Sequence, residues 1–175
     1  ENQNNEIIWT YTGPGSPGMK QFNRKHQNIY WYRKGSSWTF NEDEVRIPHS
    51  EKTTDNFNPG NRGSGFVAEN YALQKGKLPE SWWDFAIAQR FPVDGIKRAG
   101  YPTEKPWGLL ERIIKGASNE GDIVADFFAG SGVTAAVSES LNRKWICSDL
   151  GKFSIHTARK RLIGVQRKLK KEDKN

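Results

Sequence analysis

The sequence predicts an α/β fold that is built on a parallel sheet. Residues 123–128 form a short run of mostly apolar, β-branched and aromatic side chains, which is typical of a buried strand. Gly130-Ser-Gly132 follows as a turn, and residues 134–141 have the apolar spacing of a helix. A strand, a glycine turn and a helix in this order indicate the nucleotide-cofactor corner of a Rossmann-like sheet. Glycine suits this turn because a side chain would hold the backbone away from a cofactor.

The residues around the turn indicate which cofactor it binds. Gly130 to Ala135 also satisfies the dinucleotide pattern, and Asp149 lies where that pattern expects a ribose-binding acid. Asp126, however, directly precedes the turn, where its carboxylate would repel a pyrophosphate at the helix N-terminus. S-adenosylmethionine has no phosphate, and its ammonium and sulfonium groups both favour a nearby carboxylate. The residues therefore favour S-adenosylmethionine over NAD, while Asp126 in a purely structural role would only cap the turn.

A second motif, Tyr101-Pro-Thr-Glu-Lys-Pro106, leads into a predicted helix. Lys105 precedes a proline and is therefore biased towards an extended conformation, whereas Pro106 suits the first turn of a helix. Gly116 is suited to end this helix. Between them lies an apolar stripe at helical spacing, which consists of Leu109, Leu110, Ile113 and Ile114. Taken alone, this segment is a capped core helix.

The two motifs together resemble motif X followed by motif I of amino-DNA methyltransferases. Tyr101-Pro-Thr-x-Lys-Pro-x-x-Leu-Leu-x-Arg-Ile-Ile114, then Asp126-Phe-Phe-Ala-Gly-Ser-Gly132, is similar to the β-order group, which includes the modification subunits of type III restriction systems. Trp145-Ile-Cys-Ser-Asp149-Leu150 resembles the second cofactor strand of that family, whose terminal acid holds the ribose hydroxyls. The resemblance implies a Rossmann-like S-adenosylmethionine-dependent methyltransferase fold that is incomplete in this chain.

The resemblance also implies which residues bind S-adenosylmethionine. They are the matching positions of the three motifs: Pro102, Thr103, Lys105, Pro106, Asp126, Phe127, Phe128, Ala129, Gly130, Ser131, Gly132, Thr134, Asp149 and Leu150.

The N-terminal part resembles the two late strands of the same family. These are residues 5–11 and 26–32, and residues 37–49 continue the pattern. We therefore expect three parts: the late strands with a basic loop (1–49), a loop-rich target-recognition or linker region (50–100), and the cofactor-binding part (101–175). Residues 51–79 are polar and rich in Asn and Gly, which predicts a loop. Trp82 and Trp83 are expected in the core, with base stacking as the alternative.

The catalytic motif of the family is missing from these residues. An acidic or polar residue, two prolines and an aromatic residue would grip the amine of a flipped base, and the chain has no such run. In the β order it would precede Glu1, so no catalytic residue is assigned and we expect a part of a longer or split enzyme. The predicted reaction is methylation of adenine N6, with cytosine N4 as the alternative target because the residue that opens the catalytic motif is absent, and with double-stranded DNA as substrate. The expected partners are the missing N-terminal half and a second copy or a restriction subunit. The alternatives are a non-catalytic cofactor- or DNA-binding module and an NAD-binding fragment.

The net charge of +7 comes from the C-terminal end of the sequence. The last 25 residues carry nine of the 27 Lys and Arg and two of the 20 acids, so they hold the whole excess. A terminal helix with an apolar face would place these basic residues in solvent, with a DNA-contacting tail as the alternative. The stronger DNA candidate is the loop after the first late strand, because no acid occurs from residue 7 to residue 40. Its predicted DNA-binding residues are Lys20, Arg24, Lys25 and His26, and an ordinary solvated loop is the competing interpretation.

Composition limits the remaining classes. No long apolar run and no leader-like segment occurs in the sequence, and no membrane association is expected. The single cysteine, Cys147, excludes an internal disulfide and is expected to be a small buried strand residue; no metal site is predicted. The resemblance implies a cytoplasmic protein of a prokaryote or phage.

Overall fold

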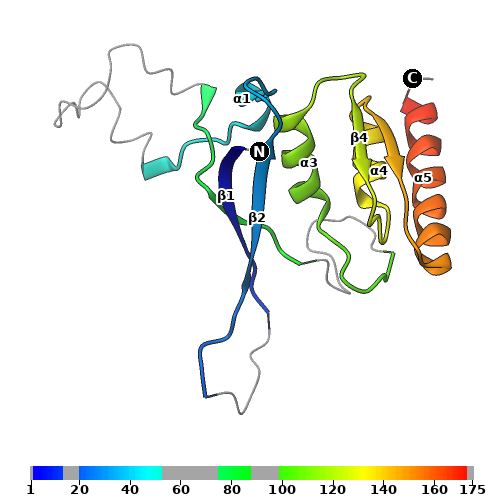
Figure 1. The fold of residues 1–175 in the computed structure, drawn as a ribbon, viewed down its shortest axis with the longest axis horizontal. Coiled ribbons are helices and arrows are strands. Elements are labelled where there is room, and N and C mark those ends of the chain that lie inside the picture. Colours follow the sequence, from blue (N-terminus) through cyan, green and yellow to red (C-terminus); the bar gives the residue numbers. More distant parts are fainter. Residues whose placement is uncertain (1, 14–19, 53–74, 88–98, 173–175) are drawn as a thin grey trace.

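The computed structural model describes residues 2–13, 20–52, 75–87 and 99–172. Within them the chain forms two sheets and three longer helices (Figure 1). The first sheet has the strand order β2-β1-β3, and the second pairs β4 with β5. The predicted α/β class is therefore confirmed for the described part of the chain.

The N-terminal hairpin contains the two predicted late strands. β1 (Asn2–Thr10) pairs antiparallel with β2 (His26–Arg33), with a register shift between Gln3 and Asn5. Alternation along β1 buries Ile7 and Trp9, which are 7% and 2% exposed, because successive side chains point to opposite faces. β3 (Trp82–Asp84) pairs in parallel with the end of β1.

β3 lies in the region where the sequence predicts loop and core tryptophans. Trp82 is 60% exposed, so the core placement is wrong for this residue. Trp83 is half-buried and donates its indole N–H to the carbonyl of Glu80. Most of the predicted loop lies outside the described residues.

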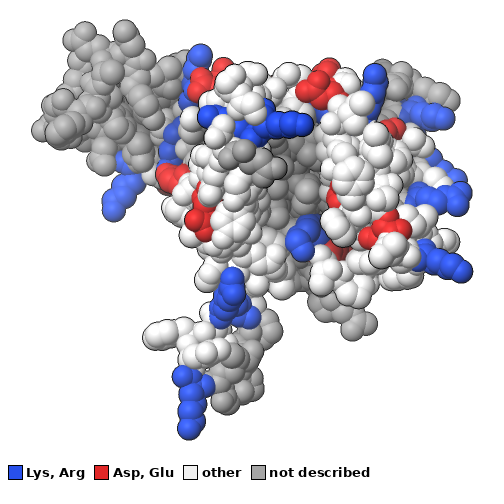
Figure 2. Space-filling view, viewed as in Figure 1, with Lys and Arg blue, Asp and Glu red and all other residues white. Residues whose placement is uncertain are grey.

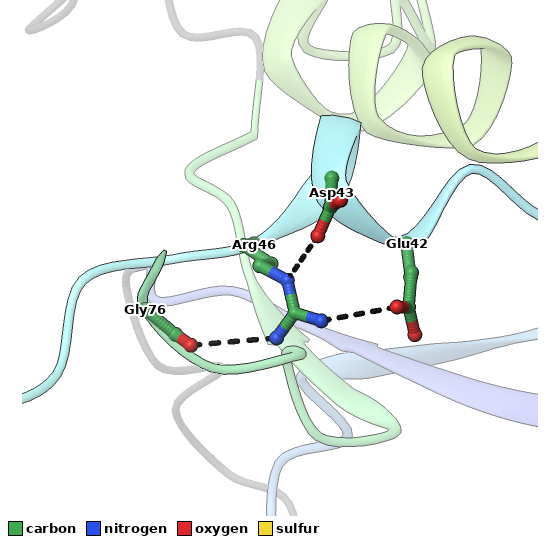
Figure 3. Close-up of polar contacts among 4 residues, drawn as sticks. All are labelled: Glu42, Asp43, Arg46 and Gly76. Carbon is green, nitrogen blue, oxygen red and sulfur yellow. Dashed lines mark hydrogen bonds and ion pairs between the residues drawn. The ribbon is translucent and has the colours of Figure 1, made fainter. Parts of the chain in front are cut away.

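A short helix, α1 (Glu42–Val45), is tied to the segment before β3 by one guanidinium (Figure 3). Arg46 contacts Asp43 Oδ1 at 2.6 Å and Glu42 Oε1 at 3.2 Å, and it donates to the carbonyl of Gly76. The hydrogen bond from Arg46 lowers the pKa of Asp43, and the same contact raises the pKa of Arg46. This cluster joins α1 to Gly76, six residues before β3 begins.

Residues 101–172 contain a parallel β-α-β unit, which one helix precedes and another follows in the sequence. α3 (Trp107–Ala117) begins after Pro106, as predicted, and buries Leu109 and Ile114. β4 (Ile123–Asp126), α4 (Val133–Ser140) and β5 (Lys144–Cys147) follow, and β4 pairs in parallel with β5. The chain ends in α5 (Lys152–Glu172). Both strands run towards the same end of the molecule, which is also the end where β1 enters the hairpin loop (Figure 1).

In the described part of the chain, helices cover only one face of the β4-β5 sheet. α4 packs on both strands, and α3 and α5 pack on α4. Val124 lies with Ile114, Val133 and Val137 in this core. On the opposite face Ile123 is 63% exposed and Ile146 is 54% exposed.

The spacing of Ile155, Ala158, Leu162, Val165 and Leu169 predicts an apolar face on the terminal helix, and the structure has this face with two differences. Ala158 and Leu162 are buried, and Val165 and Leu169 are partly buried, whereas Ile155 is exposed. Arg161, which the sequence places among the solvated basic residues, is instead partly buried. None of the helices in the described ranges is both long enough and apolar enough to span a membrane.

Candidate functional site

Asp126 lies at the carboxyl end of β4 and holds the start of the glycine turn. Its Oδ1 accepts the backbone N–H of Phe128 at 3.0 Å, and its Oδ2 accepts the hydroxyl of Thr134 at 2.7 Å. Thr134 belongs to the first turn of α4, so the carboxylate joins the strand end to the helix start. The structural role considered for Asp126 is therefore present. A carboxylate has about four lone-pair positions, so two remain for a cationic ligand group.

Asp149 connects the next strand end to the same turn. Its Oδ2 accepts the backbone N–H of Gly130 at 2.9 Å, and its Oδ1 accepts that of Gly151 at 2.8 Å. These hydrogen bonds, that from Gly151 first, lower the pKa of Asp149, because they favour the charged carboxylate. The structure thus brings together two acids that lie 23 positions apart in the sequence.

Both glycines of the turn have left-handed backbones, and one of them is also packed closely against a helix. Gly130 has φ 50° and Gly132 has φ 73°, and this conformation favours glycine. A β-carbon on Gly132 would lie 2.5 Å from the β-carbon of Ala158 in α5. From the sequence, both glycines are expected to let the backbone approach a cofactor closely. In the structure, Gly132 lets the turn approach α5 closely.

Exposed apolar side chains lie beside these polar groups. Phe127 is 63% exposed, Phe128 is 91% exposed and Leu150 is fully exposed. Leu150 directly follows Asp149, and Phe128 lies two residues before Gly130. Two carboxylates and several exposed apolar side chains thus lie at the carboxyl ends of β4 and β5. Together they fit a ligand that has a flat apolar ring and, in addition, hydroxyl groups or a positive charge. By contrast, Ala129 and Ser131 are buried in the turn.

Part of the motif that precedes α3 (residues 101–106) lies beside the glycine turn. A β-carbon on Gly130 would lie 3.5 Å from the ring of Tyr101, which stacks on Phe153 of α5. Pro106 is buried at the start of α3. Pro102, Thr103 and Lys105 are exposed.

Two of these exposed residues have distinctive local contacts. Thr103 has φ 61°, an uncommon value for a residue other than glycine. Lys105 donates to the carbonyl of Thr103 at 3.3 Å, and its ammonium lies 5.9 Å from the ring of Trp9. Lys105 is therefore next to the hairpin sheet, and no hydrogen bond between described residues joins it to the glycine turn.

Sequence reasoning missed two residues that lie close to the site. Arg161 donates to the carbonyl of Ser131 at 2.9 Å and pairs with Glu104 at 2.5 Å. Glu104 occupies the variable position of the first motif, and Arg161 lies 57 residues away. The available signal was helical spacing, because Arg161 falls on the same side of α5 as Ala158 and Leu162.

Cys147 lies half-buried at the end of β5, opposite Asp126 in the parallel ladder. Burial raises the pKa of its thiol, and the charge of Asp126 adds to this effect. Cys147 is therefore a strand residue, as predicted, but it is half-buried rather than buried, and the raised pKa keeps its thiol protonated near neutral pH.

A cavity of about 560 Å³ lies elsewhere in the molecule, between the hairpin and α3. Its walls include Asn4, Trp31, Arg33, Trp83 and Ile113. No residue of the glycine turn lines it, so this cavity and the candidate cofactor site are separate features.

The predicted DNA-binding residues lie on the hairpin that projects from the rest of the molecule. Lys20, Arg24 and His26 are exposed, and Lys25 is partly buried with its carbonyl accepting the N–H of Tyr11. Figure 2 shows Lys and Arg side chains on this hairpin, and no acid on the face in view. Residues 14–19 of the loop lie outside the described residues. The hairpin loop and the glycine turn lie at the same end of the molecule (Figure 1).

Comparison with known proteins gives the family. A family model described as DNA methylase matches residues 2–160. The chain is 32% identical to the type II methyltransferase M.HpaI of Haemophilus parainfluenzae, over 91% of this chain and 45% of that protein. It is 32% identical to the DNA adenine methyltransferase YhdJ of Escherichia coli strain K12, over 89% of this chain and 51% of that protein. The chain thus spans about half the length of these relatives.

Solved structures give the fold. The crystal structure of the M1.HpyAVI–SAM complex matches 91% of this chain and 62% of its own, with a TM-score of 0.58 and 23% identity. The cytosine-N4-specific PvuII DNA methyltransferase matches 89% of this chain and 49% of its own, with a TM-score of 0.61 and 17% identity. The fold is therefore that of the Rossmann-like DNA methyltransferases. With the match to the family model over most of its length, the chain belongs to the DNA methylase family of N4/N6 methyltransferases.

Proposed function

We propose that this chain supplies the cofactor-binding part of a DNA methyltransferase that transfers a methyl group from S-adenosylmethionine to an exocyclic amine. One observation carries the proposal. Asp126 and Asp149 lie at the carboxyl ends of two adjacent parallel strands, and both are hydrogen-bonded to the glycine turn between them. In open α/β sheets a ligand binds outside these strand ends.

The residues of this edge fit S-adenosylmethionine group by group. Asp149 is ionised and suited to accept the two ribose hydroxyls, and the free lone pairs of Asp126 suit the ammonium group. Phe128 and Leu150 offer apolar surface for the adenine ring. When bound, the cofactor supplies a methyl group activated by its positive sulfur. Pro102, Thr103 and Lys105 would border the site from the motif before α3.

We further propose adenine N6 as the target amine. The support is the 32% identity to a DNA adenine methyltransferase, together with the Asp126-Phe-Phe-Ala-Gly-Ser-Gly132 form of the glycine turn. The cytosine-N4 enzyme shares the fold at 17% identity, which supports the fold alone.

The proposed activity requires a second polypeptide segment. The 175 residues contain no pair of adjacent prolines, and hence no catalytic tetrapeptide of the kind the family uses. Among the described residues, β2 pairs only with β1 and β4 only with β5, so each sheet has an open edge. Parallel sheets are normally covered on both faces, yet Ile123 and Ile146 lie on an uncovered face. We propose that the segment carrying the catalytic residues binds on this uncovered face of the β4-β5 sheet.

The test is methyl transfer by the chain alone and by the chain mixed with a separately expressed polypeptide that carries the catalytic tetrapeptide of the family. With tritiated S-adenosylmethionine and duplex DNA, the chain alone should give no labelled DNA, and the two together should give labelled N6-methyladenine. Labelled DNA from the chain alone would place the active site within these residues and contradict the proposal. Cofactor binding without any transfer by the pair would favour a non-catalytic module.

Substitutions at two isoleucines of similar exposure test where the proposed contact lies. Ile146 is 54% exposed on the bare sheet face, and Ile163 is 46% exposed on α5. Ile146→Lys should abolish transfer by the pair while leaving the melting temperature of the chain alone unchanged. Ile163→Lys should leave both unchanged. Equal loss from both variants would show that the sheet face is not the contact.

The basic hairpin is the proposed DNA contact. Lys20 and Arg24 are exposed on a segment without acids, at the same end of the molecule as the cofactor edge. Such side chains bind phosphates and fix the position of a duplex without reading its sequence.

A further inference from the structure

The backbone of residues 130–132 lies against one stripe of α5. Ser154 donates its hydroxyl to the carbonyl of Gly130, and Arg161 donates Nε–H to the carbonyl of the next residue at 2.9 Å. The third residue of the turn packs on Ala158 so closely that a β-carbon there would clash. The three α5 residues are spaced by four and three positions, so they share one helix face. Each residue of the turn thus has its own contact on α5.

Arg161 makes a second contact that leaves the turn. Its Nη2 pairs with Glu104 Oε1 at 2.5 Å, and Glu104 Oε2 accepts the backbone N–H of Ala99 at 3.1 Å. The side chains of Arg161 and Glu104 are only 10% and 3% exposed, so the pair is shielded from water. Glu104 lies between Thr103 and Lys105, two of the proposed cofactor-binding residues. One guanidinium therefore connects the motif before α3 to the glycine turn.

We propose that Arg161 is a positioning residue of the cofactor site, which sets the glycine turn and the segment around Glu104 in register with each other. The inference rests on the proposed function, because it concerns the site for S-adenosylmethionine. In a trans peptide the C=O and N–H groups point in opposite directions. Holding the carbonyl of Gly130 on α5 therefore turns the N–H of Ser131 away from the helix, while the N–H of Gly132 donates to the carbonyl of Ala129 inside the turn. Without Arg161 the carbonyl of Ser131 loses its side-chain donor, and the carboxylate of Glu104 loses its ion pair and keeps the hydrogen bond from Ala99.

Replacing Arg161 with lysine tests its two contacts independently of each other. A lysine ammonium can pair with Glu104, but it lacks the planar fork that reaches a second acceptor in a different direction. Arg161→Lys should therefore keep the charge pair and lose the contact with the turn. Arg161→Met loses both. Arg159→Met is the matched control, because Arg159 is exposed on the same helix.

The first experiment compares stability with cofactor affinity in the full 175-residue chain. Calorimetric titration with S-adenosylmethionine, at a temperature where circular dichroism shows every variant folded, should give an affinity for Arg161→Lys lower by about tenfold, as expected for one lost charge-assisted hydrogen bond. Its melting temperature should fall by only about 2–4 °C, which is less than for Arg161→Met because the pair with Glu104 is kept, and Arg159→Met should match the parent in both. Parent-like affinity in Arg161→Lys would overturn the proposal. So would an affinity loss in the two Arg161 variants that follows their melting temperatures alone.

The second experiment tests the connection without any ligand. Glu104→Gln should shift the amide NMR signals of Ser131 and Gly132, although Glu104 contacts them only through Arg161. In an Arg161→Met background the same substitution should leave those signals in place. If the parent binds no S-adenosylmethionine, the proposed function fails and this measurement still decides the positioning role. Signals that do not respond to Glu104→Gln, or that respond equally in both backgrounds, would overturn it.

Discussion

Gly130 donates its backbone N–H to Asp149 Oδ2 at 2.9 Å, and this bond joins the glycine turn after β4 to the end of β5. The parallel ladder continues past both strands, because Ala129 donates to the carbonyl of Ser148 at 3.0 Å. The acid and the turn are therefore one unit before any ligand binds. Changes to Asp149 should affect both the fold and the cofactor site.

Asp149 should make the stability of the chain depend on pH in the acid range. Its pKa is lowered in the folded state, so it stabilises the fold above its unfolded pKa of about 3.9, and this stabilisation is lost as pH falls through the lower folded value. Asp149→Asn should lower the free energy of unfolding at neutral pH, and the difference from the parent should shrink in acid. Urea denaturation across the pH range checks this, with the exposed Glu120→Gln as control. A difference that is constant with pH would show that the carboxylate charge is not involved.

Alanine substitutions at three glycines distinguish the cost of a left-handed backbone from the cost of a clash with α5. Gly132→Ala should destabilise the chain by about 2–4 kcal/mol, because it adds a left-handed alanine and a clash with Ala158. Gly121 also has a positive φ, 81°, but open space around it, so Gly121→Ala should cost only about 1–2 kcal/mol. Gly164→Ala in α5 meets no neighbour within 4 Å and should stabilise by about 1 kcal/mol.

Thermal and urea unfolding of the three variants check this order. Equal costs at Gly132 and Gly121 would mean that α5 moves away from the turn without penalty, and the close packing described above would then carry no energy.

The basic hairpin and the terminal helix should differ in their response to salt. Each phosphate contact contributes about 0.9 to the slope of log affinity against log salt on duplex DNA. Replacing Lys20, Arg24 and Lys25 with alanine should therefore reduce the slope by about two to three units, whereas truncation after Leu169 should reduce it less. Fluorescence anisotropy with a labelled duplex at several salt concentrations measures both slopes. A larger effect of the truncation would assign DNA binding to the terminal helix.

The sequence predicts the parts of the fold that depend on local patterns. The strand–turn–helix unit, both late strands and the terminal helix lie within a few residues of their predicted bounds, because alternation, helical spacing and glycine positions specify them. β4 ends at Asp126 rather than Phe128, since the carboxylate of Asp126 accepts the N–H of Phe128 and starts the turn. The contact of Arg161 with Glu104 was not predicted, because two residues 57 positions apart meet only through helix packing. β3 was missed for the same reason, since three residues gain strand pairing only from β1.

Titration of the purified chain with S-adenosylmethionine and with NAD tests the central claim most directly. The account predicts that S-adenosylmethionine binds and NAD does not. It also predicts that Asp126→Asn, which keeps an acceptor for the N–H of Phe128 and removes the charge, weakens binding by about tenfold without unfolding the chain. Binding of NAD with an affinity unchanged in Asp126→Asn would contradict the assignment of this edge to S-adenosylmethionine.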